Sequence, residues 1–139
     1  MAIQAIFMEQ IPNAGKRLPA EVAIKMKAIV LKKTCSPEEL KISEVPVPEV
    51  KPGWVLIKVK AFGLNRSELM MREYEGNAPY IKLPRIMGIE CAGEIADPSG
   101  SRFRKGQRVV ALMGGMGRSF NGSYAEYTLV PEKNVFTVD

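Results

Sequence analysis

Apolar and polar residues alternate along several short segments of the chain, which is the pattern of half-buried β-strands. Segment 54–61 shows it most clearly, because Val55, Ile57, Val59 and Ala61 fall on one face and two lysines fall on the other. Similar β-like runs occupy 27–33, 88–96, 107–113 and 123–130. Several short strands separated by turns predict a mainly β domain, either a barrel or a sandwich.

Prolines, glycines and one capping signal mark the segments between these strands. Residues 46–53 contain three prolines and a glycine, and residues 76–87 contain two prolines, so both predict loops. Asn65 is followed three residues later by Glu68, which is the spacing of a capping box, and predicts a short helix after Asn65. The glycine-rich segment 114–122 precedes a β-like run, whereas a dinucleotide-binding loop would open a helix, so it predicts a flexible loop.

The first residues differ in character from the rest of the chain. Residues 1–25 mix proline, glycine and asparagine with scattered apolar residues and show no clear period. We interpret them as an N-terminal extension or leader, and residues 26–139 as one domain with its own hydrophobic core.

Composition narrows the function classes. The chain of 139 residues is 46% hydrophobic and 25% charged, with a net charge of +5. Its lysines and arginines are dispersed among acids and do not predict a nucleic-acid site. No apolar stretch approaches the roughly 18 residues that cross a bilayer, and the opening residues do not resemble a secretory signal. We expect a cytoplasmic protein that binds neither nucleic acid nor membrane.

The chain contains no histidine and only two cysteines, Cys35 and Cys91. Histidine is the usual general base and metal ligand near neutral pH, so its absence excludes Ser-His-Asp and Cys-His hydrolases. It also leaves only carboxylates and thiolates as ligands for zinc. Two cysteines cannot form a disulfide framework, which favours a reducing compartment.

Five motifs occur in an order that points to a family. They are MKAIVLKK, ISEVPVPEVKPGWVLIKVKAFGLNRSEL, PRIMGIECAGEI, FRKGQRVVAL and GSYAEYTLVP. In this order they resemble the N-terminal domain of medium-chain dehydrogenases/reductases, the superfamily of alcohol dehydrogenases and quinone oxidoreductases. The resemblance implies a GroES-like fold, an irregular and partly open β-barrel with a few short helices. In complete members a Rossmann domain follows, and we expect no Rossmann domain in this chain.

The resemblance also bears on zinc. Zinc-dependent members have a catalytic cysteine and a histidine at the positions of Asn65 and Ile89. An amide and an aliphatic side chain cannot replace these ligands, so we expect no zinc and assign the chain to the zinc-independent quinone-reductase type. No four-cysteine spacing for structural zinc is present, and Cys91 is expected to be a small core residue rather than a nucleophile.

Five positions are candidate site residues by this resemblance. Asn65 is expected to be catalytic and to contact the cofactor ribose or a substrate carbonyl, besides capping its helix. Ile89 and Glu90 are expected beside the substrate, although an ion pair with a nearby Arg or Lys is the simpler interpretation of Glu90. Met70 stands where relatives often have a tyrosine, which puts the substrate class in doubt. Arg72 would approach a phosphate or an enolate, or else occupy a solvated helix face.

The resemblance implies a reductase of small carbonyl compounds or quinones that uses NADPH. We expect this chain, without the missing Rossmann domain, to bind NADPH weakly at best and to be inactive alone. The surface normally covered by that domain predicts a homo-oligomer. A non-catalytic GroES-like binding or structural module is the alternative, and half of a zinc-dependent alcohol dehydrogenase is a weaker third.

Overall fold

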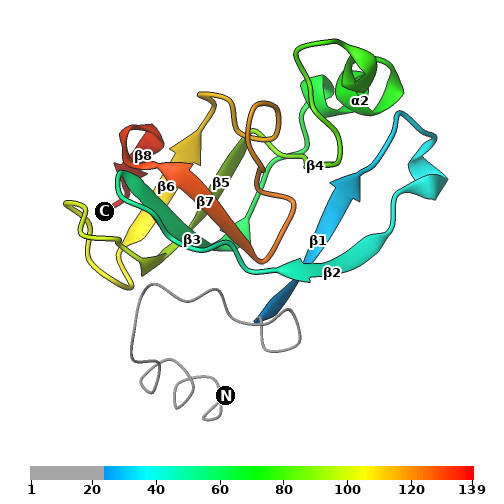
Figure 1. The fold of residues 1–139 in the computed structure, drawn as a ribbon. Coiled ribbons are helices and arrows are strands. Elements are labelled where there is room, and N and C mark those ends of the chain that lie inside the picture. The colour runs from blue at the N-terminus through cyan, green and yellow to red at the C-terminus, as the bar shows by residue number, and fades with distance from the viewer. Residues whose placement is uncertain (1–23) are drawn as a thin grey trace.

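The computed structural model describes residues 24–139, and residues 1–23, which hold most of the expected extension, lie outside the described residues. The described chain forms two antiparallel sheets (Figure 1), of strand order β2-β1-β4 and β7-β3-β5-β6-β8. The strands are β1 (Lys25–Leu31), β2 (Ile42–Pro46), β3 (Trp54–Ala61), β4 (Arg85–Ile86), β5 (Glu90–Asp97), β6 (Arg108–Leu112), β7 (Tyr127–Pro131) and β8 (Val135–Thr137). The helices are α2 (Arg66–Glu73) and the short 3-10 helices η1 (Pro37–Glu39), η2 (Glu75–Asn77) and η3 (Glu132–Asn134).

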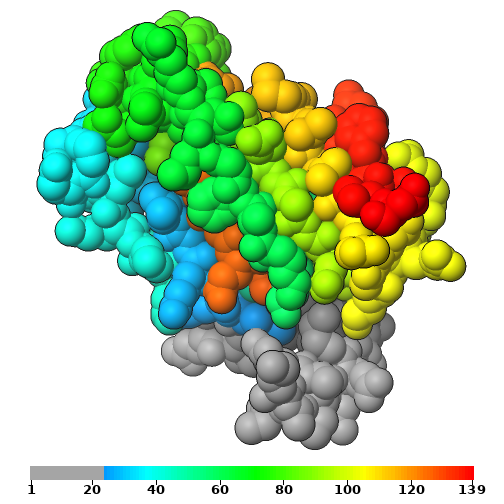
Figure 2. All heavy atoms as spheres, turned by 180° about the vertical axis from the view of Figure 1, so that it is seen from behind, coloured from blue at the N-terminus to red at the C-terminus, as the bar shows by residue number. Residues whose placement is uncertain are grey.

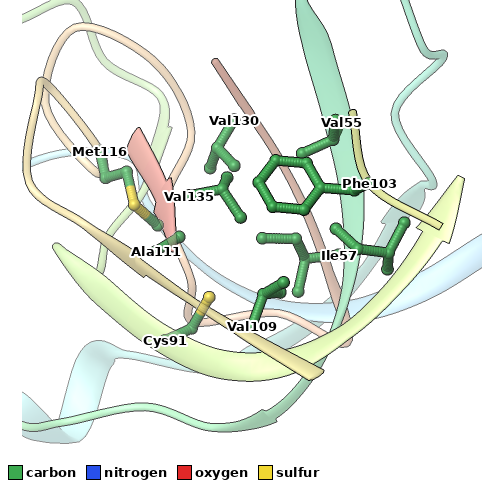
Figure 3. Packing of buried hydrophobic residues seen from close by; sticks show 10 residues of the cluster. Val55, Ile57, Cys91, Phe103, Val109, Ala111, Met116, Val130 and Val135 are labelled. Atoms are coloured by element: carbon green, nitrogen blue, oxygen red, sulfur yellow. The ribbon is translucent and has the colours of Figure 1, made fainter. Parts of the chain in front are cut away.

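The five-stranded sheet curls around the first hydrophobic core. Because side chains alternate along each strand, one face of every strand supplies this core. Figure 3 shows side chains from β3, β6, β7 and β8 converging inside the curl. The core consists of Val55, Ile57, Cys91, Ile95, Phe103, Val109, Ala111, Met116, Val130 and Val135.

A second core lies between β1 and α2. It contains Met26 and Leu31 of β1, Met71 of α2, and Met87 and Tyr124 from two loops, together with neighbouring apolar side chains. Three of these five are methionines, whose flexible side chains fill irregular gaps between a helix and a short strand. Through this core, α2 packs against the barrel.

The predicted strand 54–61 is confirmed as β3, but its two faces are less regular than predicted. Val55 and Ile57 are buried as expected. Ala61 is exposed, because the pairing of β3 with β5 shifts register between Val59 and Ala61. Leu56, on the opposite face, is also buried. An irregularity of this kind turns later side chains to the other face of the sheet.

The predicted strand 123–130 is only partly correct, since β7 begins at Tyr127. The preceding residues hydrogen-bond to both sheets: Ile29 donates its backbone N–H to Tyr124 at 2.8 Å, and Val59 donates to Glu126 at 2.9 Å. Residues 123–126 therefore join β1 to β3 instead of extending one ladder.

These features confirm a mainly β, partly open barrel with short helices. All pairs of named strands in residues 24–139 are antiparallel. In that same part of the chain, no helix has the length and apolarity that crossing a bilayer requires.

Candidate functional site

The N-terminus of α2 fixes Asn65 in place. Asn65 is the N-cap residue, as the sequence predicts, and Glu68 closes the capping box. The backbone N–H of Asn65 donates to Oε2 of Glu68 at 2.6 Å. Glu68 is only 4% exposed, so this charged acceptor lies within the protein and holds the start of the helix firmly.

The same carboxylate reaches a second segment of the site. Oε1 of Glu68 accepts the backbone N–H of Ile89 at 3.1 Å. Asn65 and Ile89 are thus held by the two oxygens of one buried side chain. Burial, together with the negative charge of Glu68, raises the pKa of Tyr124 to about 12, which keeps this phenol protonated.

Asn65 and Glu90 form the polar centre of the site. The Nδ2 atom of Asn65 donates to Oε1 of Glu90 at 3.1 Å. The expected ion pair is wrong, because none of the ion pairs within residues 24–139 includes Glu90. Gly63 makes room for this contact, since a Cβ atom there would lie 2.1 Å from Oε1 of Glu90.

A tight crossing behind Glu90 holds the segment 88–90. Gly88 has a φ of +108°, and a Cβ atom there would lie 2.3 Å from Oγ of Ser123. The Ser123 hydroxyl donates to the carbonyl oxygen of Glu90 at 2.6 Å and is fully buried. Sequence reasoning missed Ser123, because the partner of its hydroxyl lies 33 residues away along the chain.

Arg72 does not occupy the solvated helix face that the sequence favoured. It is 7% exposed, and its guanidinium donates to the carbonyl oxygen of Cys35 and to Oε1 of Glu73. Cys35 in turn donates its backbone N–H to the Arg72 carbonyl at 3.0 Å. Through these hydrogen bonds, Arg72 connects the end of α2 to the loop after β1. Met70, half-buried in α2, keeps its substrate-binding role only as a prediction.

Arg118 is a second residue that sequence reasoning missed. It lies in the glycine-rich segment 114–122, and it forms an ion pair with Glu75 and donates to the Ser67 carbonyl at 3.2 Å. Glu75 also accepts the hydroxyl of Tyr80 at 3.1 Å. Arg118 therefore joins the loop after β6 to the first turn of α2 and to the first residue of η2. No local pattern signals it, because Glu75 is 43 residues away along the chain.

The donors at the site do not fit a tetrahedral zinc ion, which takes about four thiolate, imidazole or carboxylate ligands. Asn65 and Ile89 supply none of these groups. Cys91 is buried in the first core, as expected, and burial raises the pKa of its thiol to about 11. Within the described residues, no three Cys, Asp or Glu side chains cluster as a metal site would need.

Comparisons with known proteins agree with the fold. The family model for the alcohol dehydrogenase GroES-like domain matches residues 51–139. A zinc-type alcohol dehydrogenase-like protein of Schizosaccharomyces pombe is 37% identical over 111 residues, covering 78% of this chain and 33% of its own. A quinone oxidoreductase of Sus scrofa is 35% identical over 114 residues, covering 80% and 33%. The chain thus spans about a third of the length of these curated relatives.

Solved structures give the same picture. The human synaptic vesicle membrane protein VAT-1 homolog-like protein superposes with a TM-score of 0.73 at 29% identity, covering 84% of this chain and 36% of its own. The quinone oxidoreductase of Coxiella burnetii superposes with a TM-score of 0.69 at 26% identity, covering 82% and 37%. The chain therefore belongs to the alcohol dehydrogenase GroES-like domain family of the medium-chain dehydrogenase/reductase superfamily.

Proposed function

We propose that residues 26–139 form the substrate-side half of a zinc-independent reductase that uses NAD(P)H to reduce a quinone or an enone. The hydrogen bond from Asn65 to Glu90 carries this proposal. By the motif resemblance, Asn65 is matched to the position of a cysteine ligand in zinc-dependent members, which supports a neutral amide donor in place of a metal ligand. The similarity to quinone oxidoreductases supports the same substrate class.

The amide of Asn65 suits the stabilisation of a developing oxyanion. Its NH2 group carries two protons, and one of them is directed to Glu90. The second proton is available to the carbonyl oxygen of a bound acceptor. A nicotinamide cofactor, when bound, supplies the hydride, and the chain's task is to orient the acceptor and to stabilise negative charge on its oxygen. The contacts of Glu68 and Glu90 hold the amide in place before substrate arrives.

The exposed apolar side chains beside the site fit a surface that another domain or subunit covers. Leu64, one residue before Asn65, is 82% exposed, and Leu69, in the helix that Asn65 caps, is also exposed. Large apolar side chains exposed next to one site are typical of interaction surfaces. The proposal therefore includes association through this face, either with a cofactor domain or with a second copy.

The test uses protein made from its complete reading frame, with nicotinamide absorbance following the reduction of a naphthoquinone and of an α,β-unsaturated ketone. Asn65→Ser keeps an N-cap residue but removes the amide, so we expect kcat to fall about 100-fold, the scale of one lost oxyanion donor. Asn77→Ala, at an exposed asparagine that bonds Thr34, is the matched control and should retain activity. Metal analysis accompanies each preparation.

Three results would count against the proposal. Full activity of Asn65→Ser would remove the amide from the mechanism. Activity that needs stoichiometric zinc would contradict the metal-free assignment. A complete protein that binds neither NADPH nor NADH would favour the non-catalytic binding module.

A further inference from the structure

A groove outside the Asn65–Glu90 site lies where the two sheets meet. Its volume is about 380 Å³, at the lower end of the roughly 300–1,000 Å³ of small-molecule pockets. Figure 2 shows orange residues between the blue surface of β1 and the green surface of β3 and the residues that follow it. The groove is lined by Lys27, Ala28, Ile29, Ile42, Val59, Lys60, Ala61, Phe62, Tyr124, Ala125 and Glu126.

The groove has an apolar interior that water reaches. Ile42 on one wall is 70% exposed and Phe62 on the other is 40% exposed. The ring of Phe62 packs against the ring of Tyr124, with centroids 4.6 Å apart. The buried Glu68 carboxylate beside Tyr124 is not among the groove residues, so the tyrosine presents its ring to the groove. The apolar part of a bound ligand would shield both walls of the groove from water.

Charge at the rim is predominantly positive. Lys27 and Lys60 line the groove, and within residues 24–139 Lys27 takes part in none of the ion pairs. Lys60 pairs with Glu94 at 3.9 Å, with both side chains about half exposed, which is a weak interaction that a ligand can replace. The carboxylate at the rim, Glu126, accepts the backbone N–H of Lys27 at 2.7 Å and is held to the backbone.

We propose that this groove binds a small amphipathic anion, with its apolar body against Ile42, Phe62 and Tyr124 and its anionic head at Lys27 and Lys60. The apolar walls favour a ligand with an apolar part, and the two lysine ammonium groups favour a negatively charged head group. The groove borders the Asn65 site through Tyr124, which lies beside Glu68, but the Asn65 amide donates to Glu90 and to none of these five residues.

The test is calorimetric titration of the 139-residue chain with three probes of one chain length: dodecanoate, dodecanol and dodecylammonium. We expect dodecanoate to bind with a stoichiometry of one, dodecanol about tenfold more weakly, and dodecylammonium not measurably. The double variant Lys27→Gln/Lys60→Gln should weaken dodecanoate about tenfold and leave dodecanol unchanged, since two exposed ion pairs are lost. Ile42→Ser should weaken both dodecanoate and dodecanol.

Matched controls keep the result specific to the groove. Lys105→Gln and Val50→Ser change an exposed lysine and an exposed valine outside the groove and should leave all affinities unchanged. Equal affinity for the three probes, or insensitivity to the groove variants, would overturn the proposal. Two further outcomes would overturn the proposal: binding that appears only after residues 1–23 are removed, and binding that weakens at high protein concentration as a dimer forms. In both cases the occupant of the groove would be the protein chain itself.

Discussion

The two backbone bonds of Glu68 permit a quantitative test of how the site is held together. Glu68→Ala removes the acceptors of the Asn65 and Ile89 N–H groups, at 2.6 and 3.1 Å, and leaves a buried gap in their place. A buried donor left unpaired costs about 1–3 kcal/mol, so two of them should lower the free energy of unfolding by about 2–6 kcal/mol. In a domain of this size the melting temperature should fall by roughly 10–20 °C.

Urea and thermal unfolding, followed by circular dichroism, measure this loss. Glu68→Gln keeps one acceptor oxygen and should lose about half as much as Glu68→Ala. Glu49→Ala, at an exposed glutamate in the loop after β2, is the control and should stay within about 0.5 kcal/mol of the wild type. If Glu68→Ala were as stable as Glu49→Ala, the buried carboxylate would not be holding Asn65 and Ile89.

Three further predictions follow from burial and from the donor set. Because burial raises the pKa of Cys91 to about 11, an aromatic disulfide reagent at neutral pH should label Cys35 alone, and labelling of Cys91 before unfolding would contradict its place in the core. The pKa of Tyr124 is raised from 10.0 to about 12. The protonated phenol should therefore contribute its full stabilisation below pH 10, and this stabilisation should be lost as the pH rises toward 12. In urea unfolding at alkaline pH, Tyr124→Phe should abolish this loss. The wild-type chain should retain no tight zinc after dialysis, whereas Asn65→Cys/Ile89→His should gain measurable affinity; stoichiometric zinc in the wild type, or none in the variant, would refute the assignment of these positions.

Local sequence patterns predicted the parts of this protein that depend on near neighbours. The alternation over 54–61 identified β3, because the period of a strand is set by its own backbone. The spacing of Asn65 and Glu68 identified the start of α2, because a capping box involves only one turn. The motif order placed the chain in its family before any contact was known.

The tertiary structure alone decided which partner each polar side chain takes. Arg72 sits at a position whose local pattern suits a solvated face, yet it is buried because the loop at Cys35 folds over the end of α2. Glu90 accepts a hydrogen bond from an amide 25 residues away instead of pairing with a cation. Arg118 finds Glu75 across 43 residues of chain. Helix and strand periods follow from backbone geometry, so a short stretch of sequence shows them. These contacts depend on how segments far apart in the chain pack together, and no short stretch of sequence contains that information.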